Sequence, residues 1–264
     1  MRLFSGFAQT AGLLSLAVAV RCSFEGHQHP LQQDVNPFTP PGTVVWACNS
    51  LDRGIVLTFD DGPSPGNTEN LLDYLSKTGL KATFFVVGAN AQRYPDVVRR
   101  IVNDGHLLGS HTWSHANLTD LVQTKGIDAL ASEIDRNEEL LFGITQQRPW
   151  LFRPPYGAIN EAIRKYLEDR GYTIVMWNAG CFDWYYQNVT QELVPLINGL
   201  PDAGAIVCMH DLYESTVGGL PVLVDAFTGT EGYINPQGRR IITMEECINP
   251  GRSAHSRNSQ RSEL

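Results

Sequence analysis

The sequence lacks an excess of positive charge, and this narrows the range of partners. Its 264 residues carry 28 Asp and Glu against 20 Lys and Arg, which gives a formal net charge of −8 at pH 7. An acidic chain is repelled by the phosphates of nucleic acids and by anionic membrane surfaces. We therefore expect no nucleic acid among its partners, whereas a neutral substrate is compatible with this charge.

The sequence also lacks an apolar run at its N-terminus that is long enough to cross a bilayer. The run at residues 12–20 is shorter than the roughly 20 residues that a membrane helix needs. Arg2 precedes it, and Ala17-Val18-Ala19 fits a small-x-small cleavage site, so residues 1–19 are predicted to be a secretory signal peptide. A buried N-terminal helix is the alternative. The polar C-terminus offers no apolar tail for a lipid anchor, so we expect a secreted, extracellular protein without a membrane anchor.

Internal repeats, low-complexity tracts and interdomain linkers are absent as well. We therefore expect one folded domain at residues 43–248, long enough to bury a sizeable core, and a monomer. Residues 20–42 show no periodicity and are predicted to be an extended lead-in. Residues 249–264 are polar and are predicted to be a disordered tail.

Cysteine is scarce, and its five positions fit a secreted protein. Cys48 opens the folded region and Cys247 closes it, so a disulfide between these two is our first prediction. The pairing of Cys22, Cys181 and Cys208 stays open, since they could form a bridge or remain thiols.

Two glycosylation sequons are present, beginning at Asn117 and Asn188. Such triplets also arise by chance. The predicted signal peptide makes both asparagines candidate glycosylation sites.

Apolar runs alternate with amphipathic segments along the domain. Strands are predicted from residue 55 and at residues 82–88, 107–109, 150–152, 172–177, 205–209 and 240–243. Helices are predicted at residues 68–78, 94–103, 126–142, 160–169, 190–200 and 220–227. This alternation predicts an α/β fold in which helices wrap a parallel sheet.

Two adjacent carboxylates follow the first apolar run. Successive strand side chains point to opposite faces, so Asp60 and Asp61 can share a site only where the strand ends, at Gly62-Pro63. A simple Asp-Gly turn is the alternative. Polar clusters follow further apolar runs, and the carboxyl ends of parallel strands meet on one face of a barrel.

The second cluster is the segment from His111 to His115. Two histidines four residues apart lie on one side of a helical turn, from which they can bind one metal ion. Asp61 would complete a set of two imidazoles and one carboxylate, which leaves open positions as a catalytic zinc requires. Ordinary polar loop histidines are the alternative.

The remaining clusters offer an arginine, a carboxylate and a further histidine. Arg153 could bind a carboxylate, and the backbone N–H of Tyr156 could stabilise an oxyanion, with a rigid proline turn as the alternative. Asp183 could orient a catalytic group, and Trp184 could form an aromatic wall for a sugar ring. His210 would then supply an acid, although a lone histidine at a strand end is more often structural.

Together these clusters resemble the motifs of the polysaccharide deacetylase family, known also as carbohydrate esterase family 4 or the NodB homology domain. The matching motifs are Thr58-Phe59-Asp60-Asp61, His111-Thr112-Trp113-Ser114-His115, Arg153-Pro154-Pro155-Tyr156, Asp183-Trp184 and Cys208-Met209-His210. Their variants and the signal peptide look most like secreted fungal chitin deacetylases. The resemblance implies a distorted (β/α) barrel with about seven parallel strands, formed by the single domain at residues 43–248.

The resemblance also implies a role for each motif. Asp60 would be the general base, held by Arg153, and His210 would be the general acid, tuned by Asp183. The implied metal ligands are Asp61, His111 and His115, and the metal is usually zinc, with cobalt or nickel also known. The implied contacts to the substrate and its oxyanion come from Tyr156, Trp184 and Cys208.

Two positions depart from the family's pattern. An aspartate often stands three residues before the Asp-Trp pair, where this chain has Gly180. Leucine is common two residues before the catalytic histidine, where this chain has Cys208, at the place where the acetyl methyl would sit. Neither change touches an implied metal ligand or the base, so we expect an effect on substrate fit.

The activity implied by the resemblance is metal-dependent N-deacetylation of chitin or chitooligosaccharides, which gives acetate and a chitosan-type product. O-deacetylation of acetylated xylan by the same site is one alternative. A non-catalytic secreted chitin-binding protein is an alternative of a different class.

Overall fold

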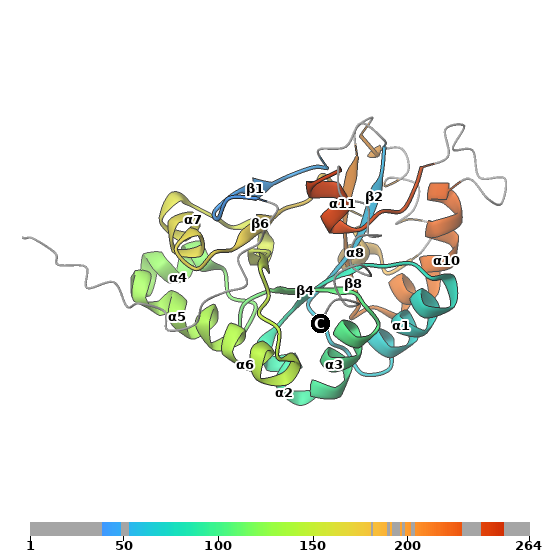
Figure 1. Cartoon of the computed structure of the whole chain (residues 1–264). Coiled ribbons are helices and arrows are strands. Elements are labelled where there is room, and N and C mark those ends of the chain that lie inside the picture. The colour runs from blue at the N-terminus through green and yellow to red at the C-terminus, as the bar shows by residue number, and fades with distance from the viewer. Residues whose placement is uncertain are drawn as a thin grey trace, which may run out of the picture. The chain divides into compact units, whose positions relative to one another are not determined.

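A parallel sheet carries the functional side chains. The computed structural model describes residues 39–48, 53–180, 182–188, 204–228 and 239–250, together with 191, 196 and 199–201. Within them, eight parallel strands are joined in the order β1-β6-β5-β4-β3-β2-β8-β7. Their bounds are β1 Val44–Val45, β2 Ile55–Asp60, β3 Thr83–Val86, β4 Leu107–Ser110, β5 Leu151–Phe152, β6 Thr173–Val175, β7 Ala179–Gly180 and β8 Ala205–His210. Figure 1 shows the curled sheet with helices along its outside.

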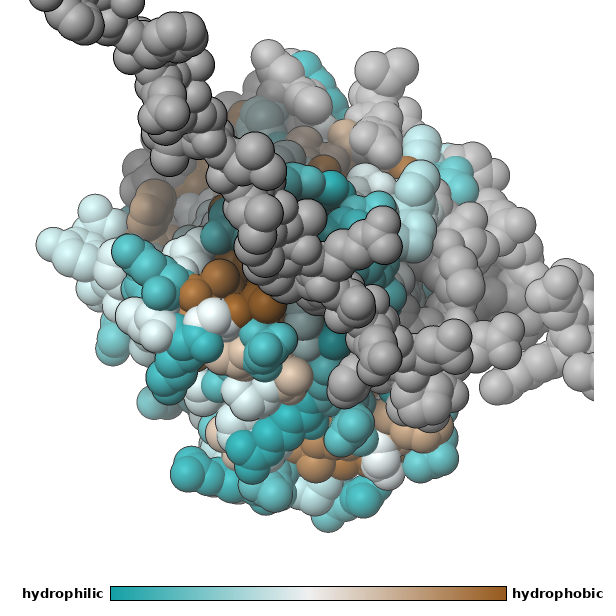
Figure 2. Space-filling model, turned by 90° about the vertical axis from the view of Figure 1, so that its left-hand side faces the viewer, coloured by the Kyte–Doolittle hydropathy of each residue, from teal (hydrophilic) through white to brown (hydrophobic). Residues whose placement is uncertain are grey.

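Helices follow most of the strands, as the alternating pattern predicts. Their bounds are α1 Asn67–Thr78, α2 Gly88–Arg93, α3 Pro95–Asn103, α4 Leu118–Lys125, α5 Leu130–Glu133, α6 Asp135–Thr145, α7 Glu161–Glu168, α8 Asp183–Tyr186, α10 Glu214–Thr228 and α11 Met244–Ile248, with 3-10 turns η1 at Ile127–Ala129 and η2 at Pro155–Gly157. Amphipathic helices expose their polar faces, and hydrophilic residues predominate on the side of the molecule that Figure 2 displays. The described residues contain no helix that is long and apolar enough to cross a membrane.

The strand β2 divides its side chains between two environments. Ile55, Leu57 and Phe59 point outward and pack in one hydrophobic cluster with leucines of α1. The intervening positions point to the inner face, where Val56 packs in a second cluster and Asp60 reaches the end of the strand. This period of two places the buried carboxylate of Asp60 on the concave side of the sheet.

The predicted α/β barrel fold is confirmed, with eight short strands in the described residues instead of about seven. Two of them, β1 and β7, have only two residues each and leave no periodic signal in the sequence. The helices α2 and α4 were not predicted either. The predicted helix at 190–200 lies largely outside the described residues, as do residues 1–19, most of the lead-in and of the tail, Cys22 and Cys181.

Two predicted elements are wrong. Residues 126–142 do not form one long helix but η1, α5 and α6, and at the break Glu133 turns its carboxylate to Ser114. Residues 240–243 do not form a strand, since only Ile241 makes an isolated bridge to Ile55. The reason lies in Thr243, which caps the N-terminus of α11 in a reciprocal pair of hydrogen bonds with Glu246.

The predicted disulfide between Cys48 and Cys247 is confirmed, and it joins residues 199 apart in the chain. It attaches α11 to the segment that leads into β2. Met244 and Cys247 of α11 pack in the inner cluster with Val56 and Ile206, so the bridge anchors the helix that fills the inner face. Figure 1 shows α11 beside β2.

Replacing Cys48 and Cys247 together with serine should lower the free energy of unfolding by about 3–5 kcal/mol. The bridge closes a loop of about 200 residues, whose entropy the unfolded chain regains when the link is removed. Urea unfolding of the variant and the parent protein, followed by circular dichroism, measures the difference. Equal unfolding free energies would contradict the stabilising role of the bridge.

Candidate active site

The adjacent carboxylates lie where the sequence pattern predicts, at the end of β2. Asp60 is the last residue of the strand, and Asp61 adopts a left-handed conformation with φ of 75°. Next to it, a Cβ on Gly62 would lie only 2.2 Å from the buried carboxylate of Asp211. The turn therefore needs glycine, and it brings both Asp60 and Asp61 to the same cleft.

Arg153 holds the first of these carboxylates. It is fully buried, and its Nη1 donates to Asp60 Oδ1 and to Thr58 Oγ1, both at 2.7 Å. Its other nitrogens donate to the backbone carbonyls of Val175 and Met176 at 3.2 and 3.1 Å. The predicted arginine-carboxylate pair is thus present, and it fixes the position of the Asp60 carboxylate.

Asp61 lies against two imidazoles. Its Oδ1 is 3.4 Å from His111 Nε2 and 3.2 Å from His115 Nε2, and the three residues form a group that could hold a metal ion. His111 Nδ1 is hydrogen-bonded to the carbonyl oxygen of Arg153 at 2.7 Å, so it donates its proton there and leaves Nε2 as a ligand. These separations suit tetrahedral zinc, whose donor atoms lie about 3.5 Å apart.

A buried oxygen in this group supports the metal site. Asp61 Oδ1 is buried and has no hydrogen-bond partner in the part of the chain that the structure describes. An unsatisfied buried carboxylate oxygen is costly, and a divalent cation would satisfy it. The donor set of one carboxylate and two imidazoles is compatible with zinc and also with cobalt or nickel.

The backbone that carries the two histidines is not the helical turn that their spacing predicts. Residues 111–115 form an irregular loop, in which Thr112 and His115 have φ of 66° and 59°. Glu133 holds this loop by accepting hydrogen bonds from the Ser114 N–H and hydroxyl, both at 2.8 Å. Two left-handed residues turn the imidazoles toward Asp61, a geometry that the i, i+4 spacing alone does not reveal.

The protonation of the metal-binding group also suits a cation. Burial alone would raise the pKa of Asp61, but the neighbouring imidazoles of His111, His115 and His210 bring it below its usual value. Burial lowers the pKa of His115 in spite of the negative charge of Asp61. An ionised carboxylate beside a neutral imidazole is the form in which these residues bind a metal.

His210 is oriented by Asp183. The buried Asp183 bonds to His210 Nδ1 through Oδ1 at 2.7 Å, and its Oδ2 accepts the His210 backbone N–H at 2.7 Å and the Thr216 hydroxyl at 2.9 Å. Burial alone would lower the pKa of His210, but the hydrogen bond and charge of Asp183, with Asp60 and Asp61, raise it to about 9. Thr216 lies on α10, and nothing in the sequence pattern indicates its part in this network.

The remaining predicted residues line a cleft of about 740 Å³ around these groups. Cys208 lies opposite Thr58 in the sheet, and its thiol donates to Asp60 Oδ2 at 3.4 Å. Tyr156 has φ of 60°, and its exposed ring lies 4.6 Å from that of His115. Trp184 is half exposed beside two further exposed tyrosines, Tyr185 and Tyr186, and Gly180 forms the other wall in register with Cys208.

One buried acid near the cleft was missed at the sequence level. Asp211 directly follows His210, accepts the Thr68 hydroxyl at 2.6 Å and packs under the Gly62 turn. Burial raises its pKa to about 7. An aspartate after a predicted catalytic histidine carries no pattern of its own, so only the tertiary structure reveals this contact.

Neither sequon asparagine is among the residues that line the cleft. Asn117 caps the N-terminus of α4, where its Oδ1 accepts the backbone N–H groups of Thr119 and Asp120 at 3.0 and 3.2 Å. Asn188 is exposed. Glycosylation at both positions stays a prediction.

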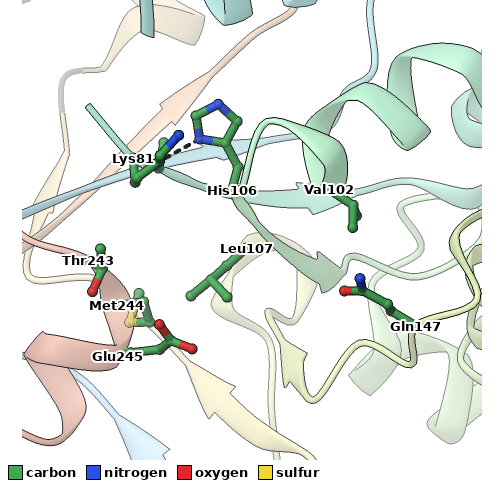
Figure 3. Close-up of a pocket in the computed structure, with 10 residues that line it drawn as sticks. Lys81, Val102, His106, Leu107, Gln147, Thr243, Met244 and Glu245 are labelled. Carbon is green, nitrogen blue, oxygen red and sulfur yellow. Dashed lines mark hydrogen bonds between the residues drawn. The ribbon is translucent and has the colours of Figure 1, made fainter. Parts of the chain in front are cut away.

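A second, smaller pocket of about 140 Å³ lies at the opposite ends of the strands. Figure 3 shows His106 beside Lys81, with Thr243, Met244 and Glu245 across the hollow. The dashed line marks the hydrogen bond from the Ala82 N–H to His106 Nδ1, 3.3 Å long. Burial lowers the pKa of His106 to about 4, so this imidazole stays neutral and is part of the packing between β3 and β4.

Comparisons with known proteins agree with the geometry. Residues 49–175 match the family model described as polysaccharide deacetylase. A chitin deacetylase of Pestalotiopsis sp is 37% identical over 221 residues, which cover 82% of this chain and 70% of that protein. The peptidoglycan-N-acetylglucosamine deacetylase PgdA of Listeria monocytogenes is 34% identical over 195 residues, or 74% of this chain and 39% of that protein. The chain thus spans less than half the length of this bacterial relative.

A solved structure of a similar protein has the same fold. The peptidoglycan deacetylase PdaC of Bacillus subtilis superposes with a TM-score of 0.65 and 30% sequence identity. The match covers 81% of this chain and 98% of the solved chain.

The pKa of His210 should fall when Asp183 is replaced by asparagine. In the metal-free protein, NMR titration of the imidazole should give about 9 for the parent and a lower value for Asp183→Asn, because burial remains while the hydrogen bond to a carboxylate and its negative charge are lost. Exposed Asp128→Asn is the matched control and should leave the His210 pKa unchanged. Equal values in the parent and the Asp183→Asn variant would contradict the assignment.

The same shift should make stability depend on pH. Because the folded-state pKa of His210 is raised, its protonation stabilises the fold fully below about pH 6.5, and this contribution disappears as the pH rises through about 9. In the metal-free protein, urea unfolding at pH 6 and pH 9.5 should show a larger loss of stability for the parent than for Asp183→Asn. A parallel pH dependence in both proteins would contradict this linkage.

Proposed function

The chain belongs to the polysaccharide deacetylase family, and on this premise we propose that it is a metal-dependent hydrolase that removes acetyl groups from N-acetylated sugar polymers. One observation carries the proposal. A carboxylate held by an arginine, a histidine held by a second carboxylate, and a possible metal group line a single cleft. The proposed catalytic domain is the segment at residues 43–248.

Asp60 is the proposed general base. The ion pair with Arg153 holds the buried carboxylate at the end of β2, where it can take a proton from the attacking water. A divalent ion held by Asp61, His111 and His115, most suitably zinc, would polarise the acetyl carbonyl and acidify water at the site.

His210 is the proposed general acid. An amine leaves poorly without a proton, and Asp183 keeps the His210 imidazole protonated near neutral pH. The backbone N–H of Tyr156 is the proposed donor to the oxyanion, and Trp184 is the proposed wall for a sugar ring. Asp60 and His210 are neighbours in the register of β2 and β8, which supports their action on one bond.

Chitin or chitooligosaccharides are the proposed substrate. Fungal chitin deacetylases and bacterial peptidoglycan deacetylases are similar to this chain to about the same degree, at 37% and 34% identity for two of them. Two features support a neutral glycan. The net charge of −8 would repel the carboxylates of peptidoglycan stem peptides, and exposed aromatic rings at the cleft suit stacking on uncharged sugars.

We also propose that the protein is secreted and monomeric. The predicted signal peptide at residues 1–19 and the disulfide between Cys48 and Cys247 support an oxidising, extracellular location. The two sequons are consistent with this location.

Replacing the base should abolish most of the activity. Asp60→Asn should lower kcat for acetate release from chitopentaose by about 10²–10⁴-fold, because the water loses its proton acceptor. Exposed Asp128→Asn should keep the parent rate. Chelation with EDTA followed by dialysis should stop acetate release, and added zinc should restore it.

Several outcomes would contradict the proposed function. Full activity after EDTA and dialysis would exclude a metal-dependent reaction. Binding to chitooligosaccharides without acetate release would favour the non-catalytic chitin-binding protein. Faster acetate release from purified peptidoglycan than from chitooligosaccharides would overturn the substrate assignment and retain the reaction.

Removal of the proposed acid, His210, should slow the release of acetate from amide substrates more than from ester substrates. His210→Asn should slow release of N-acetyl groups from chitooligosaccharides by about 10²–10⁴-fold, since the amine needs a proton to leave. Release of O-acetyl groups from acetylated xylan should slow less, because an alkoxide is a better leaving group. A parent protein that acts on acetylated xylan alone would identify the site as an O-deacetylase.

A further inference from the structure

Cys208 adds a sulfur atom to the catalytic cleft. It lines the cleft from β8, two residues before His210 and directly opposite Thr58 of β2. Asp60, Cys208 and His210 each present one possible ligand atom, and these three atoms all lie within 4.8 Å of one another. This second group shares no residue with the first group of Asp61, His111 and His115.

Arg153 and Asp183 each form a hydrogen bond with one polar atom of Asp60 and of His210, so the second polar atom of each side chain is the one that could bind a metal ion in the cleft. Arg153 occupies Asp60 Oδ1, which leaves Oδ2, and the Cys208 sulfur lies 3.4 Å from that oxygen. Asp183 occupies His210 Nδ1, which leaves Nε2. A carboxylate behind a histidine fixes the tautomer and orientation that a metal ligand needs.

We propose that Asp60, Cys208 and His210 form a second zinc site, which fills when zinc is in excess and then inhibits the enzyme. Zinc in proteins accepts this mixture of oxygen, sulfur and nitrogen donors. With Zn–S of about 2.3 Å and Zn–N of about 2.0–2.1 Å, tetrahedral donors lie about 3.5 Å apart, close to the observed separation of oxygen and sulfur. Binding releases two protons to solvent: the thiol proton of Cys208 as the Zn–S bond forms, and the Nε2 proton of the His210 imidazolium as the Zn–N bond forms.

The charges around the second site explain why it needs excess zinc. The guanidinium of Arg153 and an ion in the first site are both positive and close to it, so they repel a second dication. Within the described residues no arginine is paired with the first group, so we expect that group to fill first. Once bound, the second ion would occupy Asp60 Oδ2 and His210 Nε2, so that neither residue could act as base or acid. The inhibition therefore rests on the proposed function, whereas zinc binding itself does not.

Metal stoichiometry tests the binding without any activity. Equilibrium dialysis of the full chain against rising free zinc should give one bound ion and then two for the parent protein. Cys208→Leu and Cys208→Ser should stay at one ion over the range in which the parent binds two, because removal of a direct ligand weakens binding at least about 100-fold. Circular dichroism and thermal melting confirm that each variant is folded, and serine keeps the size of the side chain.

Cobalt provides a spectroscopic readout of the sulfur. The second equivalent of Co²⁺ added to the parent should produce a near-ultraviolet sulfur-to-cobalt charge-transfer band, which both Cys208 variants should lack. In His115→Ala, which weakens the first group, the band should persist. A parent that binds one ion, or two without this band, would overturn the second site, and so would a band lost in His115→Ala.

Inhibition is measured within each protein, relative to its own rate with one zinc ion. Excess zinc should lower acetate release by the parent at least tenfold and should leave the relative rate of Cys208→Leu and Cys208→Ser unchanged. If no protein releases acetate while the parent still shows the Cys208-dependent band, the proposed function fails and the metal site stands. Equal inhibition of the parent and both variants would overturn the inhibitory role.

Discussion

The buried ion pair between Arg153 and Asp60 is the interaction on which the site depends. A buried guanidinium is tolerated only when its donors are satisfied, and here backbone carbonyls at the end of β6, the hydroxyl of Thr58 and one carboxylate satisfy it. The carbonyl of Arg153 also receives the Nδ1 proton of His111. One residue after β5 therefore sets the position of the proposed base and the tautomer of a proposed metal ligand.

The two adjacent aspartates differ in their surroundings, and this allows each a separate role. Asp60 ends a strand and faces an arginine, whereas Asp61 turns in a left-handed conformation toward two imidazoles. Electrostatics thus divides two chemically identical side chains into a proposed base and a proposed metal ligand. Asp183 acts in a similar way on His210, whose neighbours favour the protonated imidazole.

The position of Cys208 connects substrate fit with metal chemistry. A leucine at this place would offer only an apolar surface, whereas the thiol contacts the carboxylate of Asp60. The same substitution that changes the wall of the cleft therefore creates a third donor atom between the proposed base and acid.

The sequence by itself determined the α/β class and the candidate catalytic and metal-ligating residues, because apolar runs, turn residues and five motifs are local patterns. It also indicated the disulfide, since Cys48 and Cys247 flank the folded region. Only the tertiary structure decided how the residues meet. The His111 loop is irregular and not helical, residues 126–142 break into shorter elements, and Thr216 and Asp211 join the site from α10 and the end of β8. These outcomes depend on left-handed residues and on hydrogen bonds between distant segments, which spacing along one chain does not specify.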